Sequence, residues 1–169
     1  MTIRRATPVD IPAIRAIALE AWPAAYFPDI LSAEQLAYML GLLYSERVLG
    51  DAMATKNQHF FVLEHEGEAT GFASCTPHFA RSKVTHLNKL YVLPAVLGQG
   101  AGKSLLQHVL AYSAEQGDRV IELNVNKRNT AIGFYEHMGF RILRDEVIDI
   151  GSGYVMDDYV MGRSLDASK

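Results

Sequence analysis

Three glycines at alternate positions, Gly98, Gly100 and Gly102, stand between a short apolar run and an amphipathic stretch. Glycine admits a positive φ and lets a ligand come close to the backbone. The N–H groups in the first turn of a helix have no intrahelical partner and carry a partial positive charge. A strand, a glycine loop and a helix start in this order predict a phosphate-binding site. The simpler interpretation is a glycine-rich turn, but a turn needs fewer glycines.

Two nucleotide-binding motifs do not fit this loop. Gly102-Lys103-Ser104 resembles the end of a P-loop, but that motif needs its first glycine where this chain has Leu97. The dinucleotide fingerprint G-x-G-x-x-G fails as well, because its third glycine would fall on Lys103 or Leu105. A P-loop nucleotide hydrolase is therefore a remote alternative.

The loop resembles the pyrophosphate loop of the GNAT superfamily, the acetyl-CoA-dependent N-acyltransferases. That loop reads Arg/Gln-x-x-Gly-x-Gly/Ala after a strand that ends near Val-x-Pro, and Gly100 and Gly102 fill its glycine positions. Leu97 stands where Arg or Gln is usual, which removes one side-chain donor and leaves the backbone donors. A second stretch, residues 129–140, is similar to the family block Asn-x-x-Ala-x-x-x-Tyr-x-x-x-Gly-Phe, with slightly tighter spacing.

The resemblance implies acetyl-CoA as the cosubstrate, CoA as the product and no metal. It implies that the fourth strand pairs with the pantetheine arm and that the glycine loop holds the pyrophosphate. Asn129 is implied to bind the CoA arm, and an asparagine there also suits a helix N-cap. Lys103 would add charge or be a solvated surface lysine, and Ser104 would bind phosphate or support the helix start. The expected cofactor-binding residues are Leu90, Tyr91, Val92, Gly98, Gln99, Gly100, Ala101, Gly102, Lys103, Ser104 and Asn129.

Tyr135 takes the role of catalytic acid by the same resemblance. In acetyl transfer to an amine, the amine must lose a proton, the oxyanion needs a donor, and the thiolate with a pKa of about 8.5 must be protonated. A phenol is protonated at pH 7 and can supply that proton. The alternative is a tyrosine that packs against the sheet. The general base stays open between His86, a water held by Asn124, and a nearby carboxylate such as Glu122.

The acceptor amine is expected opposite CoA, near the early helices and the last hairpin. Residues 150–161 resemble the C-terminal hairpin of bacterial polyamine (spermidine/spermine) N-acetyltransferases. Two aspartates there would attract a cationic amine or form a solvated strand edge, and two aromatic residues would wall a pocket or belong to the core. The expected substrate-binding residues are Trp22, Tyr26, Asn124, Asp157 and Asp158.

These observations favour an N-acetyltransferase that acts on a primary amine of a small molecule, with polyamines as the leading class. A protein or peptide amine acetyltransferase is the second hypothesis. A CoA-binding regulatory module without turnover is the third, and Tyr135 argues against it.

Hydrophobic periodicity predicts the elements that position these groups. A proline at position 23 is expected to end the first helix near Trp22-Pro23, and the second helical region is expected to run from about residue 33 to 54. The resemblance implies an α/β (α+β) fold with a mixed, mostly antiparallel twisted sheet of about seven strands and four flanking helices, and a splayed parallel pair at strands 4 and 5. The expected strands are residues 2–6, 60–64, 69–75, 86–93, 120–125, 140–149 and 154–161.

The composition bounds the partners. The chain has 169 residues, 49% hydrophobic and 21% charged, with a net charge of −3, which predicts a single domain over residues 1–169 and no strong field for nucleic acid. No apolar run approaches the roughly 20 residues of a membrane span. The single cysteine, Cys75, excludes an internal disulfide and suits a cytoplasmic protein. Dimers are common in the superfamily, and the edge of a C-terminal strand would serve a homodimer.

Overall fold

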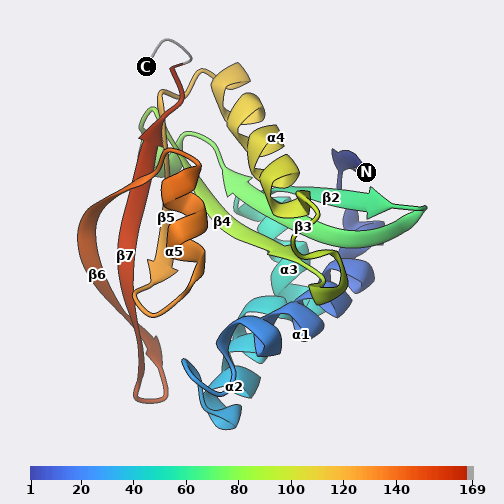
Figure 1. The fold of residues 1–169 in the computed structure, drawn as a ribbon, viewed down its shortest axis with the longest axis vertical. Helices are drawn as coiled ribbons and strands as arrows, with labels where there is room; N and C mark the ends of the chain where they lie inside the picture. Colours follow the sequence, from blue (N-terminus) through green and yellow to red (C-terminus); the bar gives the residue numbers. More distant parts are fainter. Residues whose placement is uncertain (167–169) are drawn as a thin grey trace.

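The computed structural model describes residues 1–166 and folds them around one twisted sheet (Figure 1). The strands are β1 (Thr2–Arg5), β2 (His59–His65), β3 (Glu68–Thr76), β4 (Val84–Val92), β5 (Val120–Asn126), β6 (Arg141–Gly151) and β7 (Tyr154–Ser164). The α-helices are α1 (Ile11–Tyr26), α2 (Ala33–Tyr44), α3 (Glu46–Thr55), α4 (Ala101–Glu115) and α5 (Ala131–His137).

The sheet of the described residues has seven strands in the order β1-β2-β3-β4-β5-β7-β6, and β4 and β5 are its parallel pair. Their pairing runs from Val84 opposite Val120 to Leu87 opposite Leu123 and then ends, although both strands continue. The mixed sheet and the splayed parallel pair predicted from the sequence are therefore confirmed. Beyond this point the carboxyl ends of β4 and β5 diverge (Figure 1), and the resulting unpaired gap in the sheet is here termed the opening.

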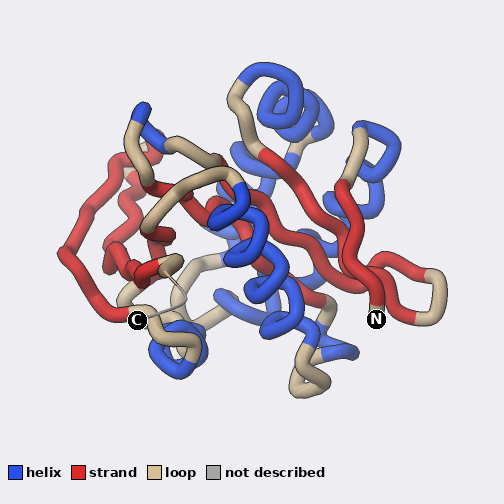
Figure 2. The backbone as a smooth tube through the Cα atoms, turned by 90° about the horizontal axis from the view of Figure 1, so that it is seen from above, coloured by secondary structure: helices blue, strands red, loops and turns tan. Residues whose placement is uncertain are grey.

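Two buried clusters divide the core between the faces of the sheet. Leu105, Leu106 and Val109 of α4 belong to the cluster on one face, together with Tyr135 of α5. Side chains of α1, α2 and α3 form the cluster on the other face. Within it, the ring of Trp22 contacts the rings of Tyr26, Tyr44 and Tyr91. Seen from above, helical segments lie on opposite sides of the curved sheet (Figure 2). None of the helices between residues 1 and 166 is long and apolar enough to cross a membrane.

The helices differ from the sequence prediction in two places. Residues 33–54 form two helices instead of one, because Ser45 adopts an extended conformation and its hydroxyl accepts the Val48 N–H at 3.2 Å as the N-cap of α3. The first helix continues through Pro23 to Tyr26. A proline inside a helix removes one backbone hydrogen bond, but the rings of Trp22 and Tyr26 pack 4.7 Å apart in the core and hold the last turn. The described residues therefore contain five α-helices, where four were expected.

A bulge in β4 sets which side chains reach each face. Ser74 pairs with Lys89 and Cys75 pairs with Leu87, so Asn88 is the extra residue. Leu87 and Leu90 consequently lie on the same face, with α4. Tyr91 lies on the opposite face, with α1 and α2.

Gly71→Ala is expected to destabilise the protein by about 1–3 kcal/mol. A Cβ at this position of β3 would lie 2.9 Å from Val92 Cγ1, 3.1 Å from Leu105 Cδ1 and 3.2 Å from the Tyr91 carbonyl oxygen. Moving that carbonyl would disturb the β3–β4 ladder, so the contact cannot relax cheaply. Urea unfolding measures the effect. The matched control is Gly133→Ala in α5, where a Cβ meets nothing within 4 Å, and equal midpoints for the two variants would contradict the close packing.

Candidate active site

The glycine loop presents backbone donors toward solvent at the start of α4. Gly98 and Gly100 have φ values of 80° and 81°, which L side chains rarely adopt, so the backbone itself requires these two glycines. Gly100 is the N-cap, and no side chain caps the helix. The first intrahelical bond reaches Ser104 N–H, which donates to Gly100 O at 2.9 Å. The amides of residues 101–103 are therefore free to donate to an anion.

Gly102 has no structural reason to be glycine. Its φ lies in the ordinary range, and a Cβ would meet only Phe134 Cζ at 3.8 Å, an ordinary contact. Glycine inside a helix costs up to about 1 kcal/mol relative to alanine. A bound molecule that approaches the backbone would explain its presence. The side chains around it are open to solvent: Leu97 is 62% exposed, and Gln99 and Lys103 are exposed.

The backbone of β4 presents alternate residues to the opening beside β5. Leu93 N–H donates to Thr70 O of β3 at 2.8 Å, so Leu93 and Tyr91 direct their peptide groups toward β3. Leu90 and Val92 therefore direct theirs toward the opening, as expected for residues that pair with a ligand arm. Tyr91 is also an expected cofactor-binding residue, and its peptide groups belong to the β3–β4 ladder.

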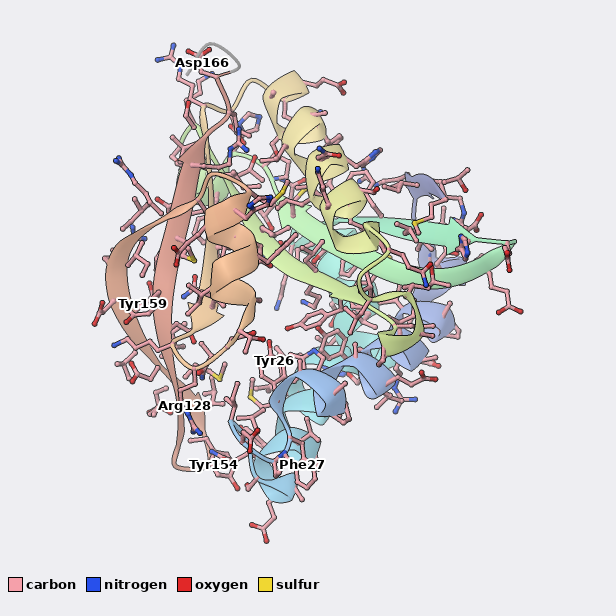
Figure 3. The ribbon with its side chains drawn as sticks, in the orientation of Figure 1. Tyr26, Phe27, Arg128, Tyr154, Tyr159 and Asp166 are labelled. Carbon is pink, nitrogen blue, oxygen red and sulfur yellow. The ribbon has the colours of Figure 1, made fainter. Side chains whose placement is uncertain are left out.

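The side chain of Tyr91 instead joins a hydrogen-bonded group at the end of the opening. Tyr26 Oη and Tyr91 Oη lie 2.8 Å apart, and Asn129 Nδ2 donates to Tyr26 Oη at 3.5 Å. Burial raises the pKa of both phenols. Figure 3 shows Tyr26 between the end of α1 and the strands on the β5 side. Asn129 also accepts the Ala131 N–H at 2.8 Å, so it supports the start of α5 and points its amide nitrogen at this group.

Tyr135 lies under the same opening, on α5. The residue is 8% exposed, and its ring packs 5.2 Å from Phe134 and 5.6 Å from Phe140. Burial, followed by the nearby Tyr26, raises the pKa of its hydroxyl well above that of a free phenol. Tyr135 therefore keeps its proton throughout the physiological pH range. Among the described residues its hydroxyl makes no hydrogen bond, so the proton is available to a ligand.

Asp158 of β7 is a buried carboxylate on the face that α1 covers. It is 4% exposed, and its Oδ1 has no hydrogen-bond partner among the described residues. Burial raises the pKa of the carboxyl to about 6, the Asn124 amide lowers it in part, and Glu146 and Asp157 raise it further. Its charge in turn raises the pKa of Tyr26. A buried carboxylate oxygen that lacks a donor is costly, which marks this group as a functional candidate.

Asp157 and Trp22 have the surroundings of the two structural alternatives that the sequence left open, a solvated strand edge and a core aromatic. Asp157 Oδ1 forms an ion pair with Lys127 Nζ at 3.1 Å, and the same ammonium lies 2.8 Å from Asp145 Oδ2. Asp157 is thus an exposed, paired carboxylate, as strand alternation requires beside a buried Asp158. Trp22 is 4% exposed and its indole N–H donates to Tyr44 Oη at 3.1 Å, so it packs behind Tyr26 and does not wall a pocket.

Two other candidates lie along the strands. His86 is in the paired part of β4, opposite Glu122, and its ring stacks on Phe79 at 4.8 Å. Burial lowers the pKa of His86, although Glu122 and Glu146 act in the opposite direction. Asn124 Nδ2 donates to Glu146 Oε1 at 3.3 Å and lies near Asp158. The side-chain amide of Asn124 thus lies with Asp158, although the register pairs Asn124 with Val160, whereas His86 precedes the opening.

Sequence reasoning missed the side-chain role of Tyr91 and did not separate Asp158 from Asp157. The signal for Asp158 is the register: β7 pairs Asp158 with Asn126 of β5 and with Glu146 of β6, which a single sequence does not give. Between residues 1 and 166, no group of three or more His, Cys, Asp or Glu side chains is arranged to hold a metal ion.

The hairpin of β6 and β7 closes the far end of this region against α2. Tyr38 Oη donates to Ile150 O at 2.7 Å, and the rings of Tyr38 and Tyr154 lie 5.3 Å apart. Arg128, which follows β5, donates to the carbonyl of Asp29 between α1 and α2. Figure 3 shows Arg128 and Tyr154 on this lower side of the molecule, below Tyr26.

Known proteins are similar to this chain in sequence. The model of the Acetyltransferase (GNAT) family matches residues 12–140. An uncharacterized N-acetyltransferase of Mycobacterium tuberculosis is 29% identical over 157 residues, which are 92% of this chain and 98% of that protein. The peptidyl-lysine N-acetyltransferase YjaB of Salmonella typhimurium is 42% identical over 71 residues, which are 41% of this chain and 46% of that protein.

Solved structures agree with the fold. The PaiA N-acetyltransferase from Thermoplasma acidophilum, in complex with coenzyme A, has a TM-score of 0.80 at 21% identity and covers 96% of this chain and 98% of that chain. The yncA acetyltransferase from Salmonella typhimurium, with its cofactor acetyl-CoA, has a TM-score of 0.66 at 25% identity, over 98% and 94% of the two chains.

Proposed function

From the premise that this chain belongs to the Acetyltransferase (GNAT) family, we propose that it acetylates a small cationic amine, with polyamines as the leading class. Family membership makes the chain an N-acetyltransferase with acetyl-CoA as cosubstrate. The observation that carries the choice of acceptor is the buried Asp158 carboxylate, which has an unpaired Oδ1 among the described residues and lies near Tyr26.

The cofactor assignment rests on the free donors at the β4–α4 junction. The amides of Ala101, Gly102 and Lys103 would hold the pyrophosphate, and the peptide groups of Leu90 and Val92 would pair with the pantetheine arm. The assignment also includes the loop residues Gly98, Gln99 and Gly100, the Ser104 hydroxyl and the Asn129 amide. The thioester of acetyl-CoA supplies the acyl group.

Gly102→Asp is expected to weaken CoA binding by about 30-fold or more, which is roughly 2 kcal/mol. The aspartate would place a negative charge where the pyrophosphate should lie. The same substitution is favourable for the free protein, because a carboxylate in the first turn of a helix stabilises it by about 0.3–1 kcal/mol. Isothermal titration with CoA and thermal unfolding measure the two effects. A folded variant that binds CoA like the parent protein would contradict the placement, and Gly102→Ala is the matched control for the lost glycine.

Asp158 would bind the ammonium group and take its proton. An alkylammonium has a pKa near 10, so transfer of its proton to a carboxyl of pKa about 6 costs about 5.5 kcal/mol. A turnover of about 10 per second corresponds to a barrier of about 16 kcal/mol, so the transfer fits within it. The neutral amine nitrogen then forms the bond to the acetyl carbon as the carbon–sulfur bond breaks.

Tyr135 would donate its proton to the departing sulfur. Its pKa is raised by burial, so the donor is fully protonated when the bond breaks. The charge of Asp158 raises the pKa of Tyr26, and the Tyr26 hydroxyl is hydrogen-bonded to that of Tyr91. These three groups would form a polar path from the opening to the acceptor side.

The polyamine proposal rests on a second carboxylate next to Asp158. Glu146 lies opposite Asp158 in the β6–β7 ladder, and such cross-strand neighbours are about 5 Å apart, close to the spacing of successive nitrogens in a polyamine. The β6–β7 hairpin contacts α2 and closes the far end of this region, which would hinder the entry of a long peptide chain. The similarity to YjaB, a peptidyl-lysine N-acetyltransferase, supports a peptide amine as the second candidate.

A panel of amines tests the acceptor class. Thiol release from acetyl-CoA is measured with spermidine, butylamine and a short lysine peptide, and mass spectrometry identifies the product. We expect kcat/KM for spermidine to exceed that for butylamine, and Glu146→Gln to reduce this preference without lowering the butylamine rate. Efficient acetylation of the peptide with little acetylation of either free amine would overturn the proposal in favour of the second candidate.

A homodimer and a cytoplasmic location complete the proposal. The free edge of the sheet on this side belongs to β6, not to the C-terminal strand β7. Val147 of β6 is 64% exposed, which supports self-association along that edge. The thiol of Cys75 is free and buried, with a pKa raised to about 12, as suits a reducing compartment. Light scattering of the parent protein and of Val147→Lys tests the dimer.

A further inference from the structure

Lys89 of β4 is a lysine without a carboxylate partner on the face that α1, α2 and α3 cover. No Asp or Glu of residues 1–166 forms a salt bridge with it. Its ammonium lies instead over two aromatic rings, 5.6 Å from the centroid of Tyr44 and 5.9 Å from that of Phe60. Burial, followed by the charge of Lys56, lowers the pKa of Lys89 to about 8.

The burial of the Lys89 ammonium lowers the stability of the protein without a ligand. A lowered pKa means that folding disfavours the charged lysine, and the neighbouring Lys56 adds repulsion instead of compensation. A leucine or methionine would fill the same position between aromatic rings without that cost. The two rings attract the ammonium by cation–π contact, but a partly buried lysine without a carboxylate partner still breaks a packing rule, and such exceptions are typical of functional sites.

Lys89 also borders a cavity of about 370 Å³, within the range of roughly 300–1,000 Å³ of small-molecule sites. Helices α2 and α3 supply its apolar wall, and Lys56 and Lys89, whose charges act on one another, supply its two ammonium groups. The lining residues are Leu42, Leu43, Val48, Leu49, Ala52, Lys56, Gln58 and Lys89. Gln58 also lines the cavity, and its Oε1 is buried without a hydrogen-bond partner among the described residues.

We propose that this cavity binds a small carboxylate with an aliphatic tail, whose anionic head pairs with Lys89 and Lys56 and whose tail packs against the leucines of α2 and α3. Two ammonium groups complement one anion and repel a cation. The tail would cover Leu42, which is 41% exposed in the free protein.

The cavity is separate from the proposed acceptor site. Tyr44 and Trp22, joined by the indole hydrogen bond at 3.1 Å, stand between Lys89 and the pair of Tyr26 and Tyr91 hydroxyls. Tyr44 is 1% exposed and Trp22 4%, so this wall is closed. A carboxylate bound at Lys89 would therefore act on the enzyme from a second site, through α1 and β4, instead of competing for the amine.

Titration calorimetry with octanoate tests the proposal on the full chain, with octanol and octylamine as probes of the same length. We expect octanoate to bind, octanol to bind at least tenfold more weakly, and octylamine, which can enter the proposed acceptor site, not to compete with octanoate. Lys89→Gln is expected to weaken octanoate binding by about tenfold or more, the effect of one lost charged hydrogen bond, and Lys56→Gln by about threefold. Lys83→Gln, an exposed lysine between β3 and β4, is the control and should bind octanoate like the parent.

Thermal unfolding separates loss of the ligand from loss of the fold. Without ligand, Lys89→Met is expected to melt above the parent protein at pH 7, because the costly charge is gone. Octanoate should raise the melting temperature of the parent and leave that of Lys89→Met unchanged. Equal binding of octanol and octanoate, or undiminished octanoate binding by Lys89→Gln, would overturn the proposal, and so would the absence of octanoate binding to the parent.

Discussion

Asp158→Asn is expected to lower kcat/KM for spermidine by about 10²–10³, within the range for loss of a general base. Asparagine keeps the size of the side chain and a polar oxygen, but it carries no charge to attract the ammonium and accepts no proton. The variant should fold, because the ionised Asp158 carboxyl, whose pKa is raised to about 6 by burial, lowers the stability of the parent. A raised carboxyl pKa means that stability is lost as pH rises through 4 to 6. The variant, which avoids this loss, should melt at or above the parent temperature at pH 7.5.

Asp157→Asn is the matched control for this result. Asp157 is the next residue on the same strand, but it is exposed and paired with Lys127. Its loss should change kcat/KM by less than about threefold, as for other exposed ion pairs. Thiol-release kinetics with spermidine at pH 7.5 compare the two variants. Equal activities for Asp157→Asn and Asp158→Asn would contradict the role of Asp158.

Tyr135→Phe is expected to lower kcat by about 10²–10⁴, the range for removal of a general acid. The phenyl ring keeps the packing against Phe134 and Phe140, and the lost hydroxyl makes no hydrogen bond among the described residues. The KM for acetyl-CoA should therefore stay within about threefold, because the hydroxyl acts only when the sulfur leaves. Pre-steady-state thiol release measures the chemical step directly.

The control for Tyr135 is Tyr112→Phe on α4. Tyr112 packs against Phe61, with ring centroids 5.1 Å apart, and lies away from the splay of β4 and β5. Its loss should leave kcat unchanged within about twofold. If Tyr135→Phe turned over at the parent rate with an unchanged melting temperature, Tyr135 would be a packing residue, and the proton for the thiolate would have to come from another group such as Tyr26.

The strands and the loop were predictable because their signals are local. Short apolar runs marked the central strands β2, β4 and β5, and the glycines marked the start of α4 within one or two residues. Pro94 and the alternating glycines fixed where β4 ends. The parallel β4–β5 pair followed from a strand, a helix and a second buried strand.

The side-chain assignments depended on information that is not local. A single extra residue at Asn88 reverses the alternation along β4, so sequence parity from Leu87 puts Tyr91 on the wrong face. Pro23 was expected to end α1, yet tertiary contacts of Trp22 and Tyr26 outweigh the one hydrogen bond that proline removes. Asp158 differs from Asp157 through pairing with β5 and β6, and two adjacent aspartates give no sign of that in a sequence.

The pH dependence of kcat/KM for spermidine, measured from pH 5 to 8 at saturating acetyl-CoA, tests the central claim most directly. Asp158 must be ionised to hold the ammonium, and its carboxyl has a pKa of about 6. The parent is therefore predicted to reach a plateau above pH 7 and to fall about tenfold by pH 5. Asp158→Asn is predicted to show a low rate without this step. A parent profile that is flat from pH 5 to 8, or a step that persists in Asp158→Asn, would contradict the assignment of Asp158 as the group that receives the acceptor amine.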